Sequence, residues 1–82
     1  MKEKIELDII NILHEKGFTD EADLETLLED ELGLDSLDKV ELVMEIEKRF
    51  NIRIDDSEAD KLLTLGDVVN LVDDKIEQRR PA

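Results

Sequence analysis

The chain has 82 residues, 40% of them hydrophobic, which allows one small domain with a modest core. Asp and Glu residues number 24 against 11 Lys and Arg residues, so the formal net charge is -13. This charge repels nucleic acid phosphates and anionic membranes, and it favours protein partners that present basic patches. There is no Cys, which excludes disulfides and thiolate metal sites and means that any thiol must come from an attached group.

The start of the chain shows no export or membrane signal. Residues 1–4 lead directly into an amphipathic stretch that contains acidic residues. No apolar run approaches the length of a signal-peptide core or of a membrane span. We therefore expect a cytoplasmic protein without membrane insertion.

Hydrophobic residues at helical spacing predict an all-α fold. High charge with few aromatic residues can also indicate disorder, but this periodicity argues against it. The first helix is expected over residues 2–16, with Gly17 as a favourable C-cap. Residues 18–35 follow as a long ordered loop. The leucines expected to pin this loop to the core are Leu24, Leu27, Leu28, Leu32 and Leu34.

The second half of the chain contains three further predicted helices. One spans residues 36–50, and a short one spans residues 55–62 with Asp55 or Asp56 as its N-cap. The last begins at Thr64, and Asp67 three residues later completes a capping-box pattern. We expect a small four-helix bundle with a long loop between helices one and two and a short third helix. Residues 1–78 would form one domain, and residues 79–82 a flexible C-terminal tail.

The sequence carries no recognisable catalytic or metal-binding motif. His14 is the only histidine, and its place near the end of the first helix suits the negative end of a helix dipole. No histidine pair, calcium-binding loop or glycine-rich phosphate loop is present. No serine lies at a spacing that indicates a triad with His14. We therefore expect no metal site and no intrinsic catalysis.

The start of the second helix carries the most chemical interest. Asp35 is a better N-cap than Ser36, because Asp38 then occupies the third helical position, where a carboxylate is favoured. The Ser36 hydroxyl would then be free at the positive end of the helix dipole, where a phosphodiester meets unsatisfied backbone N–H groups. Serines at helix starts are most often simple caps, so position alone does not identify a modified residue.

Residues 33–38 read Gly-Leu-Asp-Ser-Leu-Asp, and with residues 40–50 this segment resembles the signature of bacterial acyl carrier proteins. The resemblance extends over nearly the whole chain. In that family the serine of an Asp-Ser-Leu motif receives 4'-phosphopantetheine from coenzyme A. The resemblance implies that Ser36 is the attachment point, flanked by Asp35 and Leu37. It also implies that Asp35 and Asp38 help to position the modifying transferase and its Mg²⁺.

The same resemblance implies an acidic recognition face on the second helix, against which basic patches of partner enzymes dock. Its residues would be Asp38, Glu41, Glu45 and Glu47. Most charge runs are only solvated faces, but the first three lie at i, i+3 and i+7 beside Ser36 and offer a partner one patch. The expected partners of this monomer are a phosphopantetheinyl transferase and acyl-processing enzymes, and not nucleic acid.

Members of this family can admit the acyl chain between their helices. Apolar residues of the second and third helices have the core as their default place. The resemblance implies that some of them also line an acyl pocket. These residues are Val43, Met44, Ile46, Phe50, Ile54, Ala59 and Leu62.

The cargo stays open at this point. Leu37 and the acidic run that follows favour a fatty-acid-type carrier. Asp55, at a position where many members have proline, and the acidic loop over residues 17–28 leave the pathway open. Alternatives are a specialised carrier for D-alanyl, aminoacyl or polyketide cargo and, from another class, an unmodified acidic helical adaptor in which Ser36 is merely structural.

Overall fold

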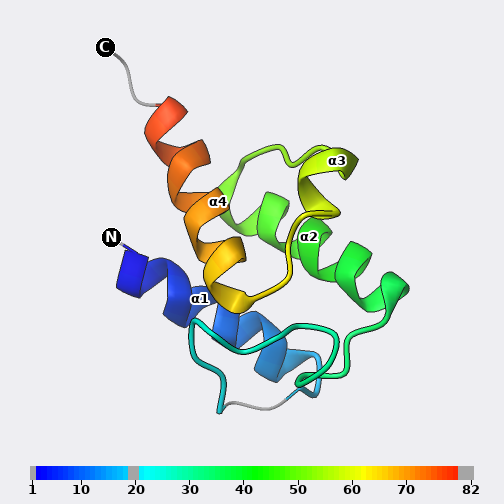
Figure 1. Cartoon of the computed structure of the whole chain (residues 1–82). Coiled ribbons are helices and arrows are strands. Elements are labelled where there is room, and N and C mark those ends of the chain that lie inside the picture. The colour runs from blue at the N-terminus through cyan, green and yellow to red at the C-terminus, as the bar shows by residue number, and fades with distance from the viewer. Residues whose placement is uncertain (1, 19–20, 80–82) are drawn as a thin grey trace.

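The computed structural model describes residues 2–18 and 21–79. This part of the chain folds into α1 (Lys2–Glu15), α2 (Ser36–Phe50), α3 (Asp56–Ala59) and α4 (Leu65–Arg79) (Figure 1). The only β pairing in these residues is an isolated bridge between Leu27 and Thr64. The predicted all-α class, with four helices and a short third one, is confirmed.

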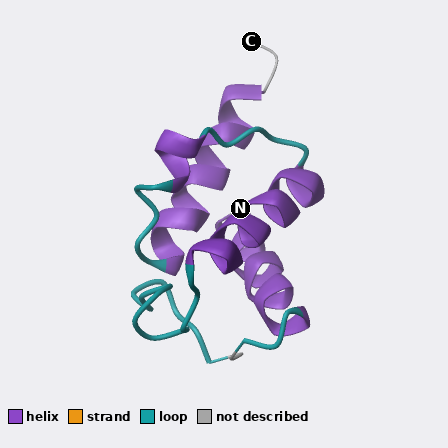
Figure 2. Cartoon of the chain, turned by 90° about the vertical axis from the view of Figure 1, so that its right-hand side faces the viewer, coloured by secondary structure: helices purple, strands orange, loops and turns teal. Residues whose placement is uncertain are grey.

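The three long helices pack around one aliphatic core. Helix α1 contacts both α4 and α2, and the loop that precedes α2 lies across one end of the bundle (Figure 2). Every buried side chain in the described residues is hydrophobic, so polar chemistry is confined to the surface. The most completely buried are Ile9, Ile12, Leu13, Leu28, Leu42, Ile46, Leu65, Val68, Val69 and Val72.

Glycine ends the first helix, as the sequence predicts. Gly17 has a φ of 92°, in the left-handed region. The Gly17 N–H donates to the His14 carbonyl at 3.0 Å, and the Phe18 N–H donates to the Leu13 carbonyl at 2.9 Å. This pair of bonds is the Schellman arrangement, which satisfies carbonyls at a helix end.

The loop before α2 is ordered by a helical turn and by three buried leucines. The Glu31 and Leu32 N–H groups donate to the Leu27 carbonyl at 3.2 and 3.1 Å. Leu28, Leu32 and Leu34 are buried. The prediction that Leu24 and Leu27 also pin the loop is wrong, because their side chains are exposed. Their backbone is used instead: the Leu24 carbonyl accepts from the Gly66 N–H at 2.8 Å.

Three predicted boundaries need correction. Helix α1 ends at Glu15 and not at residue 16. Helix α3 ends at Ala59 and not at Leu62, because the chain turns at Asp60 and Lys61 and runs on toward α4. Arg79, predicted to lie in a flexible tail, is the last residue of α4, and its guanidinium donates to the Phe50 carbonyl at 2.8 Å. The rest of the predicted tail, residues 80–82, lies outside the described residues.

Candidate functional site

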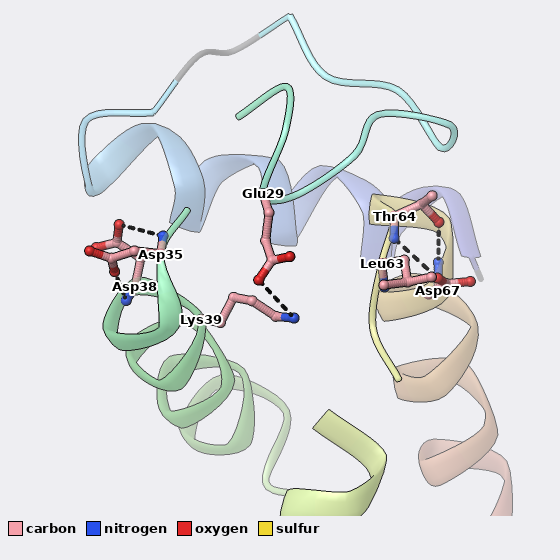
Figure 3. Close-up of polar contacts among 7 residues, drawn as sticks. All are labelled: Glu29, Asp35, Asp38, Lys39, Leu63, Thr64 and Asp67. Atoms are coloured by element: carbon pink, nitrogen blue, oxygen red, sulfur yellow. Dashed lines mark hydrogen bonds and ion pairs between the residues drawn. The ribbon is translucent and has the colours of Figure 1, made fainter. Parts of the chain in front are cut away.

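The N-terminus of α2 is capped by two carboxylates that exchange hydrogen bonds. Asp35 Oδ1 accepts from the Asp38 N–H at 2.8 Å, and Asp38 Oδ2 accepts from the Asp35 N–H at 3.1 Å (Figure 3). This is a capping box formed by acids at both positions. The prediction that Asp35, and not Ser36, caps this helix is confirmed.

Ser36 is the first residue of α2 and is exposed. Its hydroxyl has no hydrogen-bond partner among the residues that the structure describes, because the Asp35 carboxylate has taken the capping bond. Helix dipoles place positive charge at this end. A nucleophilic oxygen is thus presented to solvent at a position that favours an anion.

A cavity of about 430 Å³ lies beside Ser36, between α2, α3 and the segment leading to α4. Its apolar lining comes from Val40, Val43, Met44, Ile54, Ala59 and Leu63. Polar residues complete it, namely Ser36, Glu29, Lys39, Glu47, Asp56 and Asp60. A wider depression of about 580 Å³ shares Met44 and Ile54 with it but does not reach Ser36.

The predicted pocket residues divide into two groups. Val43, Met44, Ile54 and Ala59 line this cavity. Ile46, Phe50 and Leu62 do not. Ile46 and Leu62 are buried in the core, at 0% and 5% exposure, and Phe50 packs against the core.

Two apolar lining residues, Val40 and Leu63, were not predicted from the sequence. Val40 follows Ser36 by one helical turn, so spacing alone could have placed it beside the serine. No sequence signal marks Leu63, because its position depends on the early end of α3.

The four acids predicted for partner recognition have different surroundings. Glu41 is exposed, and neither its carboxylate nor that of the half-buried Glu45 has a partner among the described residues. The Asp38 carboxylate is occupied in the capping box. Glu47 Oε2 accepts from the Ile54 N–H at 2.8 Å, so this acid holds the chain between α2 and α3.

Glu58 connects helix α3, which forms one wall of the cavity, to α4. Glu58 Oε1 accepts from the Asp55 N–H at 3.0 Å and pairs with Lys75 Nζ of α4 at 2.9 Å. The bond from the Asp55 N–H, and then the Lys75 ammonium, lower the pKa of the Glu58 carboxyl. The sequence did not predict this tie, because Glu58 and Lys75 are far apart in the chain.

Features that would indicate other functions are not found in the described chain. His14 is exposed at the last turn of α1. Residues 2–18 and 21–79 contain no cluster of His, Cys, Asp and Glu able to hold a metal ion. None of the helices formed by these residues is long and apolar enough to cross a membrane.

Comparison with known proteins identifies the family. A family model described as a phosphopantetheine attachment site matches residues 8–72. The acyl carrier protein of Thermotoga maritima is 39% identical over 77 residues, which cover 92% of this chain and 95% of that protein. The acyl carrier protein of an Exiguobacterium species is 40% identical over 77 residues, covering 92% and 98%.

A solved structure agrees with these relatives. The crystal structure of an acyl carrier protein from Thermotoga maritima aligns with a TM-score of 0.88 at 32% identity, covering 96% of this chain and 94% of that one. The free serine at the start of α2 lies within the segment that the family model matches. The chain therefore belongs to the acyl carrier proteins, and its covalent cofactor is 4'-phosphopantetheine.

Proposed function

We propose that Ser36 carries the 4'-phosphopantetheine arm and that the protein presents acyl thioesters to fatty-acid-type biosynthetic enzymes. The observation that carries this proposal is the exposed, unpaired Ser36 hydroxyl at the first position of α2, released by the Asp35 cap. The chain has no Cys, so the thiol for thioester chemistry has to come from the arm.

The residues around Ser36 fit a phosphodiester. The Ser36 and Leu37 N–H groups have no acceptor within the described residues, and the helix dipole favours an anion there. Attachment joins Ser36 Oγ to the pantetheine-bearing phosphorus of coenzyme A, releases adenosine 3',5'-bisphosphate, and passes the hydroxyl proton to a base of the transferase. When bound, the arm supplies the thiol that holds the acyl group.

Partner enzymes would dock through the acidic side of α2. Glu41 and Glu45, with the charge of Asp38 beside Ser36, form the patch that a basic surface would meet. Such docking depends on salt, and surface charge sets the association rate more than the final affinity. We assign Glu47 mainly to holding Ile54 in place.

The cavity beside Ser36 is the proposed acyl pocket. Each methylene withdrawn from water contributes about 0.8 kcal/mol, so an apolar chain gains by entering between α2 and α3. Val40 and Leu63 belong to this pocket, whereas Ile46, Phe50 and Leu62 support it from the core.

The protein itself would make no bonds in the pathway. Its contribution is to address the cargo and to raise its local concentration at each enzyme. We propose that it acts as a cytoplasmic monomer, with a phosphopantetheinyl transferase and acyl-processing enzymes as partners and with no role in nucleic acid binding.

The intact mass tests the attachment site directly. The wild type and Ser36→Ala are incubated with coenzyme A, Mg²⁺ and a broad-specificity phosphopantetheinyl transferase. We expect one arm on the wild type and none on the variant. A folded wild type that stays unmodified, or a modified Ser36→Ala protein, would contradict the proposal.

A second assay tests the cargo. The modified protein is offered to a malonyl transferase of fatty acid synthesis and, separately, to a D-alanine ligase of the carrier-loading type. We expect efficient malonyl loading and little D-alanyl loading. The reverse preference would assign the protein to the specialised carriers.

A further inference from the structure

Lys39 has unusual surroundings for a lysine in so acidic a protein. It is the only basic residue between Lys16 and Lys48. It lies three and seven positions before Leu42 and Ile46, on the side of α2 that faces the core, and its side chain is only 17% exposed. It also lines the cavity beside Ser36.

The Lys39 ammonium lacks a close partner for its charge. Its one partner in the described residues is Glu29 of the preceding loop, with Nζ 3.8 Å from Oε2 (Figure 3). Glu29 is 56% exposed, so this pair is weak and easily exchanged. Lys75 is equally withdrawn from solvent, at 20% exposure, yet its ammonium is 2.9 Å from Glu58. A withdrawn ammonium without a close partner is costly, and Lys39 retains capacity for an anion.

Ser36 would supply that anion once it is modified. Lys39 follows Ser36 by three residues, which makes the two side chains neighbours on the surface of α2, and both line the same cavity. A phosphodiester on Ser36 also adds negative charge next to the Asp35 and Asp38 carboxylates. A cation within reach would offset this repulsion.

We propose that, once the arm is attached, the Lys39 ammonium gives up its ion pair with Glu29 and binds the phosphodiester on Ser36 instead. Attachment of the arm therefore loosens the loop that Glu29 belongs to, and Lys39 positions the first atoms of the arm at the mouth of the cavity. This inference rests on the proposed function of Ser36.

Lysine ammonium NMR tests the contact. The proteins are the unmodified and modified wild type, with Lys39→Met to identify the Lys39 signal and Lys48→Met as a control on the exposed side of α2. On attachment we expect the Lys39 Nζ signal to shift while that of Lys75 stays in place. The phosphorus resonance of the modified protein should move in Lys39→Met and not in Lys48→Met.

Amide hydrogen exchange tests the release of Glu29. In the unmodified protein, Glu29→Gln should speed exchange of the Gly33 and Leu34 amides by about 1.5- to 5-fold. In the modified protein the same substitution should change nothing further.

The possible failures are distinguishable. If intact mass shows no arm on the wild type, the proposed function falls and this inference falls with it. If the arm is present and the Lys39 signal does not move, only the inference is overturned. A Lys39 shift that appears only after acylation would also overturn it, and would assign the lysine to the cargo.

Discussion

Asp35 and Ser36 are neighbours with separate tasks. The Asp35 carboxylate satisfies the Asp38 N–H, and the fold makes no use of the Ser36 hydroxyl. A serine that capped the helix would have its oxygen engaged and its rotamer fixed. The acid at the cap thus keeps the serine available to another protein without weakening the helix start.

This division of tasks predicts unequal effects on stability. Asp35→Ala should lower the free energy of unfolding by about 1 kcal/mol, because a helix cap is lost. Ser36→Ala should cost less than about 0.5 kcal/mol, as for surface substitutions that remove no cap. Urea denaturation of the unmodified proteins in 0.5 M NaCl measures both, since salt suppresses the effect of the removed charge. Equal losses would show that Ser36 shares the capping role.

The acidic side of α2 predicts a local effect on docking. Glu41→Lys should lower kcat/KM for modification by the transferase on the order of tenfold at low ionic strength, because it places a repulsive charge against a basic patch. Glu3→Lys makes the same change in net charge at an exposed position of α1 and serves as the control. The two variants should converge at high salt. Equal slowing of both would indicate that only net charge matters.

The sequence predicts those helices and helix starts that local patterns determine. Hydrophobic stripes locate α1, α2 and α4, and Asp35 and Thr64 mark two of the starts. The extent of α3 could not be predicted. None of its four residues is buried. This region is held in place by the ion pair between Lys75 and Glu58 and by the hydrogen bond from the Ile54 N–H to Glu47.

In the candidate site too, adjacent residues determine some features and distant contacts determine others. The Asp35 cap and the free Ser36 hydroxyl at the first position of α2 depend on adjacent residues, and the sequence predicted this local geometry. The cavity depends on how α3 and residues 60–63 fold back over α2, which no local pattern encodes. Only the structure could therefore show that Leu63 lines the cavity and that Leu62 does not.

The start of α4 predicts a specific pH dependence. Asp67 Oδ2 accepts from the Leu63 and Thr64 N–H groups, each at 3.0 Å, and these bonds hold the pKa of Asp67 below its ordinary value of 3.8. The folded state thus favours the charged form. The stability that Asp67 contributes is fully present above pH 3.8 and is lost as the pH falls through the lower folded-state pKa.

Urea midpoints of the wild type and Asp67→Asn, measured between pH 7 and pH 3, test this dependence. We expect a lower midpoint for the variant at neutral pH and a difference that shrinks in acid. Asp74→Asn, an exposed position on the same helix, controls for loss of net charge. A difference between wild type and Asp67→Asn that widened in acid would refute the assignment.

The excess of acidic charge over the folded chain opposes compactness. Four ion pairs lie in the described part of the chain, against 24 acidic residues in the sequence. The folded chain measures 39 × 25 × 20 Å. The Debye length is about 30 Å at 0.01 M salt, so carboxylates across the molecule repel one another there. The charge that would attract basic partners therefore also limits stability.

Salt should stabilise the protein by screening this repulsion. We expect Tm to rise by about 5 °C or more between 0.01 and 0.5 M NaCl, since about 1 kcal/mol moves Tm by roughly 4–8 °C in a domain of this size. The double variant Glu25→Gln, Asp30→Asn removes two exposed loop charges. It should melt higher than the wild type at low salt and gain less from added NaCl. A Tm that stayed flat across the salt titration would show that repulsion among the carboxylates does not limit the fold, and that the acidic surface is tolerated without cost to stability.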